Sequence, residues 1–108
     1  MKNMEKTLEI KESINSRFAD SFNIMVKETG IKVNDNTDIS TDYWFYNWTN
    51  EMWERGGEML TVRVIADVMD DNCEFYLFTD GCIALENDTF IEFGLDDDFN
   101  NYWKKVKC

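Results

Sequence analysis

Histidine and proline are both absent from this chain of 108 residues. Without histidine, the commonest general base and a frequent metal ligand are missing, so no Ser/His or Cys/His catalytic arrangement can form. No apolar run reaches the roughly 18 residues that a membrane span requires, and the polar N-terminus has no signal-peptide core. Three cysteines without C-x-x-C spacing indicate reduced thiols rather than a disulfide framework. We therefore expect a cytoplasmic protein that makes no membrane contact.

Lysine and arginine are missing from a long internal segment. The 40 residues from Val64 to Trp103 contain no base and eleven acids, in a chain whose formal net charge is −11. Unpaired like charge repels itself and opposes the compact state, so a folded protein that keeps it has a use for it, such as contact with a positive partner. Solubility alone is the alternative. The acids of this segment are Asp67, Asp70, Asp71, Glu74, Asp80, Glu86, Asp88, Glu92, Asp96, Asp97 and Asp98.

The first half of the chain predicts two helices within a single domain over residues 1–108. Residues 5–29 carry an apolar side chain at about every fourth position, which is the spacing of one helix face. Gly30 follows, where a glycine commonly ends a helix. A short strand over 31–33 is also expected.

The second helix is expected over residues 41–55, because three large apolar side chains recur there at intervals of four. We expect these to face the core: Trp44, Trp48 and Met52. The aromatic density of residues 43–48 also permits a strand. For Tyr43 and Tyr46, an exposed or interfacial position is as well supported as a buried one.

The second half predicts an antiparallel meander followed by a helix. Alternating apolar residues indicate four strands, over residues 58–68, 73–79, 82–85 and 89–93, with turns at 70–72, 79–81 and 87–88. After Gly94, Asp96 is a plausible N-cap, with two further acids in the first turn and lysines in the last, as the helix dipole favours.

The expected fold is therefore α+β, with helices packed on one face of a four-stranded antiparallel meander in the order α-α-β-β-β-β-α. The other face of the sheet is expected to be exposed and acidic.

No motif supports catalysis or a cofactor. Carboxylates are too abundant for any pair to be informative, no glycine-rich phosphate loop occurs, and the acids near Cys82 would raise its pKa rather than activate it. The run 96–98 and the loop 34–42 invite a calcium interpretation, but neither matches the EF-hand pattern. We expect no catalytic residues, no metal and no cofactor.

The expected binding surface combines carboxylates with aromatic anchors. Arrayed carboxylates can imitate phosphates and occupy a basic nucleic-acid-binding groove, whereas nucleic acid itself would be repelled. Tyrosine and tryptophan are common interface anchors. The predicted partner-binding residues are Asp67, Asp70, Asp71, Glu74, Asp80, Glu86, Asp88, Glu92, Tyr46, Tyr76 and Phe78.

In size, acidity and aromatic content the chain resembles two classes of small acidic protein. One comprises phage-encoded anti-CRISPR and anti-restriction inhibitors, some of which are DNA mimics. The other comprises bacterial immunity proteins that neutralise a toxin nuclease. The resemblance implies a phage or mobile-element protein in a bacterial cell that binds a nuclease, a Cas effector or a restriction enzyme. A self-associating structural or assembly protein is the remaining alternative, and either a monomer or a homodimer is expected.

Overall fold

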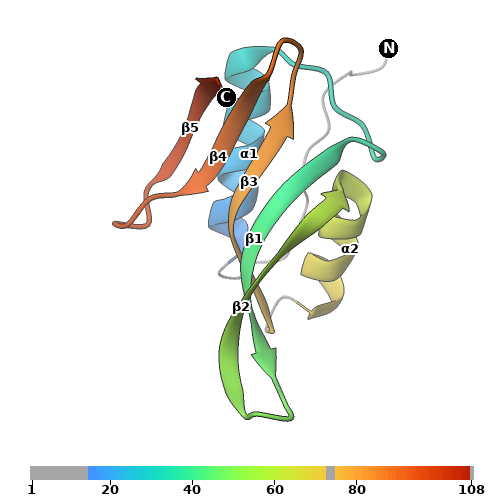
Figure 1. Ribbon diagram of the computed structural model, residues 1–108, viewed down its shortest axis with the longest axis vertical. Coiled ribbons are helices and arrows are strands. Elements are labelled where there is room, and N and C mark those ends of the chain that lie inside the picture. Colours follow the sequence, from blue (N-terminus) through green and yellow to red (C-terminus); the bar gives the residue numbers. More distant parts are fainter. Residues whose placement is uncertain (1–14, 73–74, 108) are drawn as a thin grey trace.

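The computed structural model describes residues 15–72 and 75–107 (Figure 1). Its elements, in chain order, are α1 (Ser16–Thr29), β1 (Asp38–Asn47), β2 (Met52–Thr61), α2 (Val62–Asn72), β3 (Tyr76–Ala84), β4 (Thr89–Leu95) and β5 (Asn101–Lys107).

The strands form one five-stranded antiparallel sheet in the order β2-β1-β3-β4-β5. Helix α1 packs on β3, β4 and β5, and α2 packs on β2 and β3. Both helices lie behind the sheet in Figure 1 and bury apolar residues in the same core. The α+β class and the placement of helices on one face are confirmed. The expected order is wrong, because the described elements run α-β-β-α-β-β-β.

Helix α1 lies within the predicted helix over residues 5–29. Its apolar stripe, including Phe18, Phe22 and Met25, is fully buried against the sheet. Gly30 ends the helix in the left-handed conformation at φ 72°, as predicted. The part of the predicted helix before Asn15 lies outside the described residues. Residues 31–33 form a loop rather than a strand, although Val33 reaches the core.

The helix expected over residues 41–55 is wrong, because β1 and β2 form a hairpin there. In β1, Ile39, Thr41 and Tyr43 are buried while the residues between them are exposed. A spacing of four is an even number, so it also keeps side chains on one face of a strand. The spacing of Trp44 and Trp48 therefore fits both structures, and pairing with distant β3 decides between them.

The strand expected over residues 58–68 is correct only as far as Thr61. Helix α2 begins at Val62, and its buried residues Val62, Ile65 and Met69 follow helical spacing. The β-branched residues that favour a strand here are overridden by burial of this stripe. The turn expected at 70–72 is the last turn of α2.

The hairpin turn expected at 79–81 is also wrong, because β3 runs unbroken through it. Tyr43 pairs with Phe78 and Asp42 pairs with Asp80, so Thr79 is an extra residue. Such a β-bulge reverses the alternation of a strand. Phe78 therefore faces the core, whereas Asp80 faces the other side of the sheet.

The C-terminal helix is wrong as well, because residues after the β4 strand turn back as β5. Instead of capping a helix, Asp96 Oδ1 accepts hydrogen bonds from the backbone N–H groups of Asp98 and Asn100 and so holds the β4–β5 loop. The turn at 87–88 and the strand that begins at Thr89 are confirmed, with φ of 59° at Asn87 and 58° at Asp88.

Candidate partner-binding surface

The sheet surface opposite the helices, here called the open face, has no helix covering it among the described elements (Figure 1). Because side chains alternate along a strand, each strand gives half of its residues to the core and half to this face. The pairing places Trp44, Asp42 and Ser40 of β1 on the open face, beside Leu77, Asp80 and Cys82 of β3 respectively.

Two neighbouring aspartates lie at the centre of the open face. Asp42 of β1 pairs with Asp80 of β3, and each is flanked on its far side by a glycine, Gly57 or Gly94. A Cβ atom on Gly57 would lie 2.9 Å from Asp42 Oδ1, and one on Gly94 would lie 2.8 Å from Asp80 Oδ1. The glycines therefore leave both carboxylates uncovered from the side.

Glu92 extends this charge to β4. The Tyr102 hydroxyl lies 2.5 Å from Glu92 Oε2 and 3.2 Å from Asp80 Oδ1, so a single phenol proton serves two carboxylates. Burial raises the pKa of Tyr102 far above its usual value, and these carboxylates raise it further.

Partial burial also raises the pKa of Asp80, and the charges of Asp42 and Glu92 add to the rise. The Tyr102 hydrogen bond and Arg55 act in the opposite direction. Burial is thus the largest cause of the rise, and the neighbouring carboxylates add to it.

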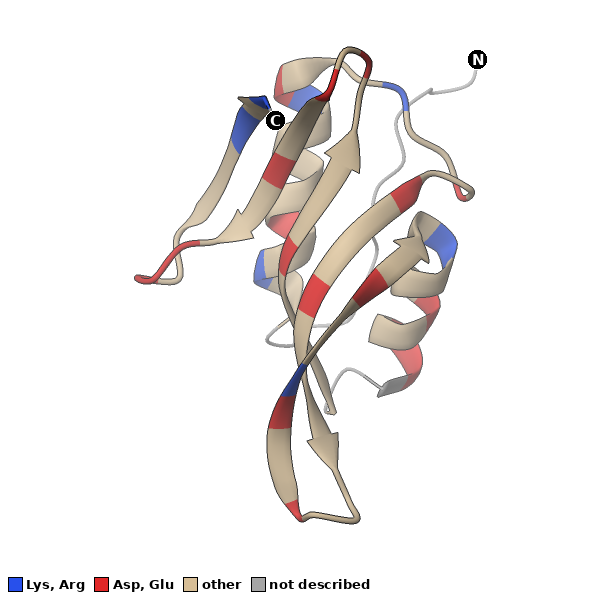
Figure 2. Cartoon of the chain, viewed as in Figure 1, with Lys and Arg blue, Asp and Glu red and all other residues tan. Residues whose placement is uncertain are grey.

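The β4–β5 loop brings two more carboxylates to the same place. Asp96 and Asp97 line a hollow of about 360 Å³ together with Asp80, Glu92 and one base, Lys104. Figure 2 shows acidic residues along β1 to β4 and in this loop. We call the set on the open face the acidic trough: Asp42, Asp80, Glu92, Asp96 and Asp97.

Next to the trough, the β1–β2 hairpin extends beyond the helices (Figure 1). Its outer part, here called the aromatic arm, consists of Trp44, Tyr46, Trp48, Met52 and Trp53. Trp48 is 66% exposed and Met52 53% exposed. Exposed apolar side chains gathered in one place mark interaction sites in soluble proteins.

The arm is well ordered by its own contacts. The Tyr46 ring packs on Trp48 at 4.7 Å and on Trp53 at 5.5 Å between centroids, and Trp48 also contacts Phe75 at 5.3 Å. At the turn, Asn47 and Asn50 donate hydrogen bonds to Glu54 and lower its pKa. Arg55 lies 5.1 Å over the Trp44 ring, and these two residues line one hollow together with Asp80, Asp96 and Asp97 of the trough.

The predicted carboxylates do not form one surface. Asp80 and Glu92 lie together in the trough, as the prediction requires. Asp67, Asp70 and Asp71 lie on α2, in the layer behind the sheet. The open face thus has only part of the predicted set.

The remaining predicted residues lie in different parts of the structure. Glu86 and Asp88 lie at the turn between β3 and β4, whereas Glu74 lies outside the described residues. Tyr46 belongs to the aromatic arm. Phe78 is buried in the core at 3% exposure, and Tyr76 packs partly buried beside it, so neither lies on the open face as a surface anchor. Within the strand predicted over 73–79, Tyr76 and Phe78 thus belong to the core-facing side rather than to the exposed one.

Asp42 and the indole side chains of Trp44 and Trp48 were missed as surface groups, because the predicted helix placed them elsewhere. Asp96 and Asp97 were assigned to a helix start. The alternation of residues 39–43, which fits a strand, is the sequence signal that places Asp42 on the sheet surface.

Among the described residues, no three cysteine or acidic side chains gather closely enough to hold a metal ion. Neither helix of that part of the chain combines the length and the hydropathy needed to cross a membrane. Comparison of the chain with protein-family models, with curated proteins and with solved structures finds no match.

Proposed function

We propose that this protein is a non-enzymatic inhibitor whose open face docks on the basic nucleic-acid-binding site of a partner protein. The acidic trough is the observation that carries the proposal. Glycines leave the sides of Asp42 and Asp80 uncovered, and partial burial, with a further contribution from the charges of Asp42 and Glu92, raises the pKa of Asp80. Lysine and arginine side chains of a partner would neutralise this charge as they neutralise the phosphates of nucleic acid.

The partner class follows from the charge. An anti-CRISPR or anti-restriction inhibitor, with or without DNA mimicry, would occupy the site of a Cas effector or a restriction enzyme. An immunity protein would cover a toxin nuclease in the same manner. Inhibition in each case is steric and electrostatic, and opposite charges accelerate encounter at low salt.

In this proposal the aromatic arm supplies binding affinity that charge alone does not provide. Charge steers association, whereas a few buried aromatic anchors usually provide most of the affinity. Trp48 and Trp53 already pack with Tyr46, so little side-chain freedom is lost when a partner covers them.

The test compares two triple variants of equal charge. Asp42→Asn/Asp80→Asn/Asp97→Asn removes charge from the trough, and Asp67→Asn/Asp70→Asn/Asp71→Asn removes the same charge from α2. Each raises the net charge by three from −11. The wild-type chain is first tested for blocking DNA binding by a panel of purified Cas effectors, restriction enzymes and toxin nucleases at low salt, and the variants are then compared.

We expect the trough variant to lose at least about tenfold in inhibition, because several charged contacts disappear together. The α2 variant should lose much less. Equal losses would assign the effect to net charge and remove the open face from the proposal. A panel in which no protein is bound or inhibited at low salt would refute the inhibitor function.

Self-association is the second candidate, and the exposure of Trp48 and Met52 favours it. An assembly held by these side chains should persist at high salt, because apolar burial is not screened. Light scattering across a salt series separates the two: a stable oligomer supports assembly, and a monomer whose partner binding weakens with salt supports inhibition.

A further inference from the structure

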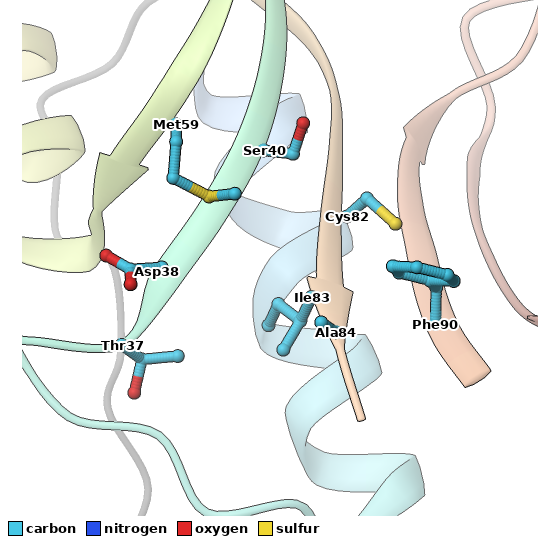
Figure 3. A pocket seen from close by; sticks show the side chains of 8 residues that line it. All are labelled: Thr37, Asp38, Ser40, Met59, Cys82, Ile83, Ala84 and Phe90. Carbon is cyan, nitrogen blue, oxygen red and sulfur yellow. The ribbon is translucent and has the colours of Figure 1, made fainter. Parts of the chain in front are cut away.

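Strands β1 and β3 separate at one end of the open face. Their pairing ends at Ser40 and Cys82, whereas β3 continues to Ala84, which pairs with Phe90 of β4. A hollow of about 530 Å³ occupies this separation (Figure 3). Its volume falls in the range of about 300–1,000 Å³ that is typical of ligand pockets.

The walls of the hollow are apolar. Met59 from β2 and Phe90 from β4 stand on opposite sides in Figure 3, with Ala84 between them. Met59 is 63% exposed, and its flexible thioether can adjust to a guest. These walls suit a long aliphatic stem.

The polar groups gather at one side. Asp38 provides a carboxylate, and Thr37 and Ser40 provide hydroxyl groups. None of the residues that line the hollow is basic, so an anionic ligand would meet repulsion without a counter-charge. An apolar channel that ends at a carboxylate fits a cation carried on an alkyl chain.

We propose that this hollow receives an arginine side chain of the basic partner, with its stem between Met59 and Phe90 and its guanidinium group at Asp38. Arginine suits the site better than lysine. Its planar, weakly hydrated cation pairs with a carboxylate through two hydrogen bonds.

The position of the hollow connects it to the acidic trough. Ser40 and Cys82 line both this hollow and the adjoining one that contains Asp42, Asp80 and Glu92. A basic protein docked on the trough therefore brings its neighbouring side chains to the hollow. The inference rests on the proposed function and names one group that the partner inserts.

The test titrates the chain of 108 residues, labelled with ¹⁵N, with capped hexaarginine and capped hexalysine peptides at low salt. Two variants probe the hollow: Ala84→Phe fills it, and Asp38→Asn removes its charge. Asp67→Asn on α2 is the control for the loss of one charge. Because Ala84 and Asp38 are both exposed, neither change removes a core contact.

We expect hexaarginine to shift the amide signals of Asp38, Ser40, Ala84 and Phe90, and to bind more tightly than hexalysine. Each hollow variant should weaken hexaarginine binding by about fivefold, the upper end for an exposed ion pair, and Asp67→Asn should leave it nearly unchanged.

Shifts confined to the trough, with Ala84→Phe and Asp38→Asn binding like the parent chain, would refute the arginine site and leave the proposed function standing. If neither peptide shifts any signal of the open face, docking on a basic partner fails together with the arginine site.

Discussion

Asn15 shows how one side chain can hold an irregular strand in place. It is 1% exposed, and its amide Nδ2 donates to the Tyr76 carbonyl at 2.6 Å while its Oδ1 accepts from the Phe78 backbone N–H at 2.9 Å. Tyr76 and Phe78 are paired with β1, but both precede Asp80, the residue of β3 at which pairing with β4 ends. Asn15 therefore replaces pairing that the sheet cannot supply.

Asn15→Ala should lower the free energy of unfolding by about 1–3 kcal/mol, because a buried donor and a buried acceptor lose their partner. Denaturant unfolding measures this loss. Asn36→Ala in the exposed turn before β1 is the control and should change stability by less than about 0.5 kcal/mol. A loss no larger at Asn15 than at Asn36 would contradict the role given to its amide.

Asp80 should make stability depend on pH in a defined direction. Its pKa is raised in the folded state, so its contribution to stability is complete below the ordinary value of about 4 and is lost as the pH rises through the raised value. Asp80→Asn should therefore stabilise the protein at neutral pH, by no more than about 1 kcal/mol since the site is partly solvated, and should lose this advantage in acid.

Thermal unfolding of both proteins at neutral and acidic pH tests this expectation, with Asp67→Asn on α2 as the control for one lost charge. An advantage of Asp80→Asn that is the same at both pH values would contradict it.

Among the elements, the β3–β4 pair depends on a glycine where the two strands approach closely. Gly94 has φ of 149°, and a Cβ there would lie 2.3 Å from the Thr79 carbonyl oxygen. Gly30 also has a positive φ, but no atom would lie within 4 Å of its Cβ. Substitution at these two glycines therefore distinguishes the energetic cost of steric overlap from the cost of the backbone conformation.

Gly94→Ala should destabilise the protein by about 3 kcal/mol or more, because backbone strain and overlap with β3 add together. Gly30→Ala should lower stability by only about 1–2 kcal/mol, the conformational term alone. Denaturant unfolding of the two variants gives the comparison, and equal losses would show that the close approach to Thr79 has no energetic weight.

The aromatic arm should matter for binding more than for folding. Trp48 is mostly exposed, so Trp48→Ala should lower stability by less than about 1 kcal/mol, whereas an anchor residue at an interface contributes about 2 kcal/mol or more. The check is calorimetric titration with whichever basic partner the panel identifies, beside a thermal melt. Unchanged affinity in Trp48→Ala would exclude the arm as the anchor.

Local sequence identified some elements well and others poorly, for physical reasons. The start of β4 after Asn87 and the end of α1 at Gly30 depend on local backbone conformation, so the sequence revealed them. The pattern predicts helices for the segment 41–55 and for the C-terminal segment, with a strand also permitted over residues 43–48. Each forms a strand because another strand is available to pair with it. Strand β3, which is distant in sequence, pairs with β1, and β4 pairs with β5 along its whole length.

The sequence predicts the acidic character of the candidate site but not its position in the fold. The excess of carboxylates is a property of composition, and it survives any error in secondary structure. The grouping of Asp42 with Asp80 depends on strand register, which local sequence does not encode.

At the scale of the whole molecule, the charge of −11 should give salt opposite effects on folding and on binding. Raising the ionic strength from about 0.01 M to about 0.15 M shortens the screening length from about 30 Å to about 8 Å. Repulsion within the chain then weakens and Tm should rise by a few degrees, while affinity for a basic partner falls. Thermal melts and titrations over one salt series measure both.

The triple variant Asp67→Asn/Asp70→Asn/Asp71→Asn serves as the comparison, because its smaller charge should make Tm less sensitive to salt. If salt left Tm unchanged in both proteins, self-repulsion would have no part in the stability of this fold.

The extra residue in β3 changes which positions of the strand face the core. Before Thr79 the even-numbered residues Tyr76 and Phe78 face the core, and after it the odd-numbered positions, Gly81 and Ile83, do. Deleting Thr79 would leave these residues on their present sides, because Asp80 would then directly follow Phe78 and alternate with it. The two faces of β3 should therefore survive loss of the extra residue, whereas the local bend and twist that a bulge adds to a strand should not.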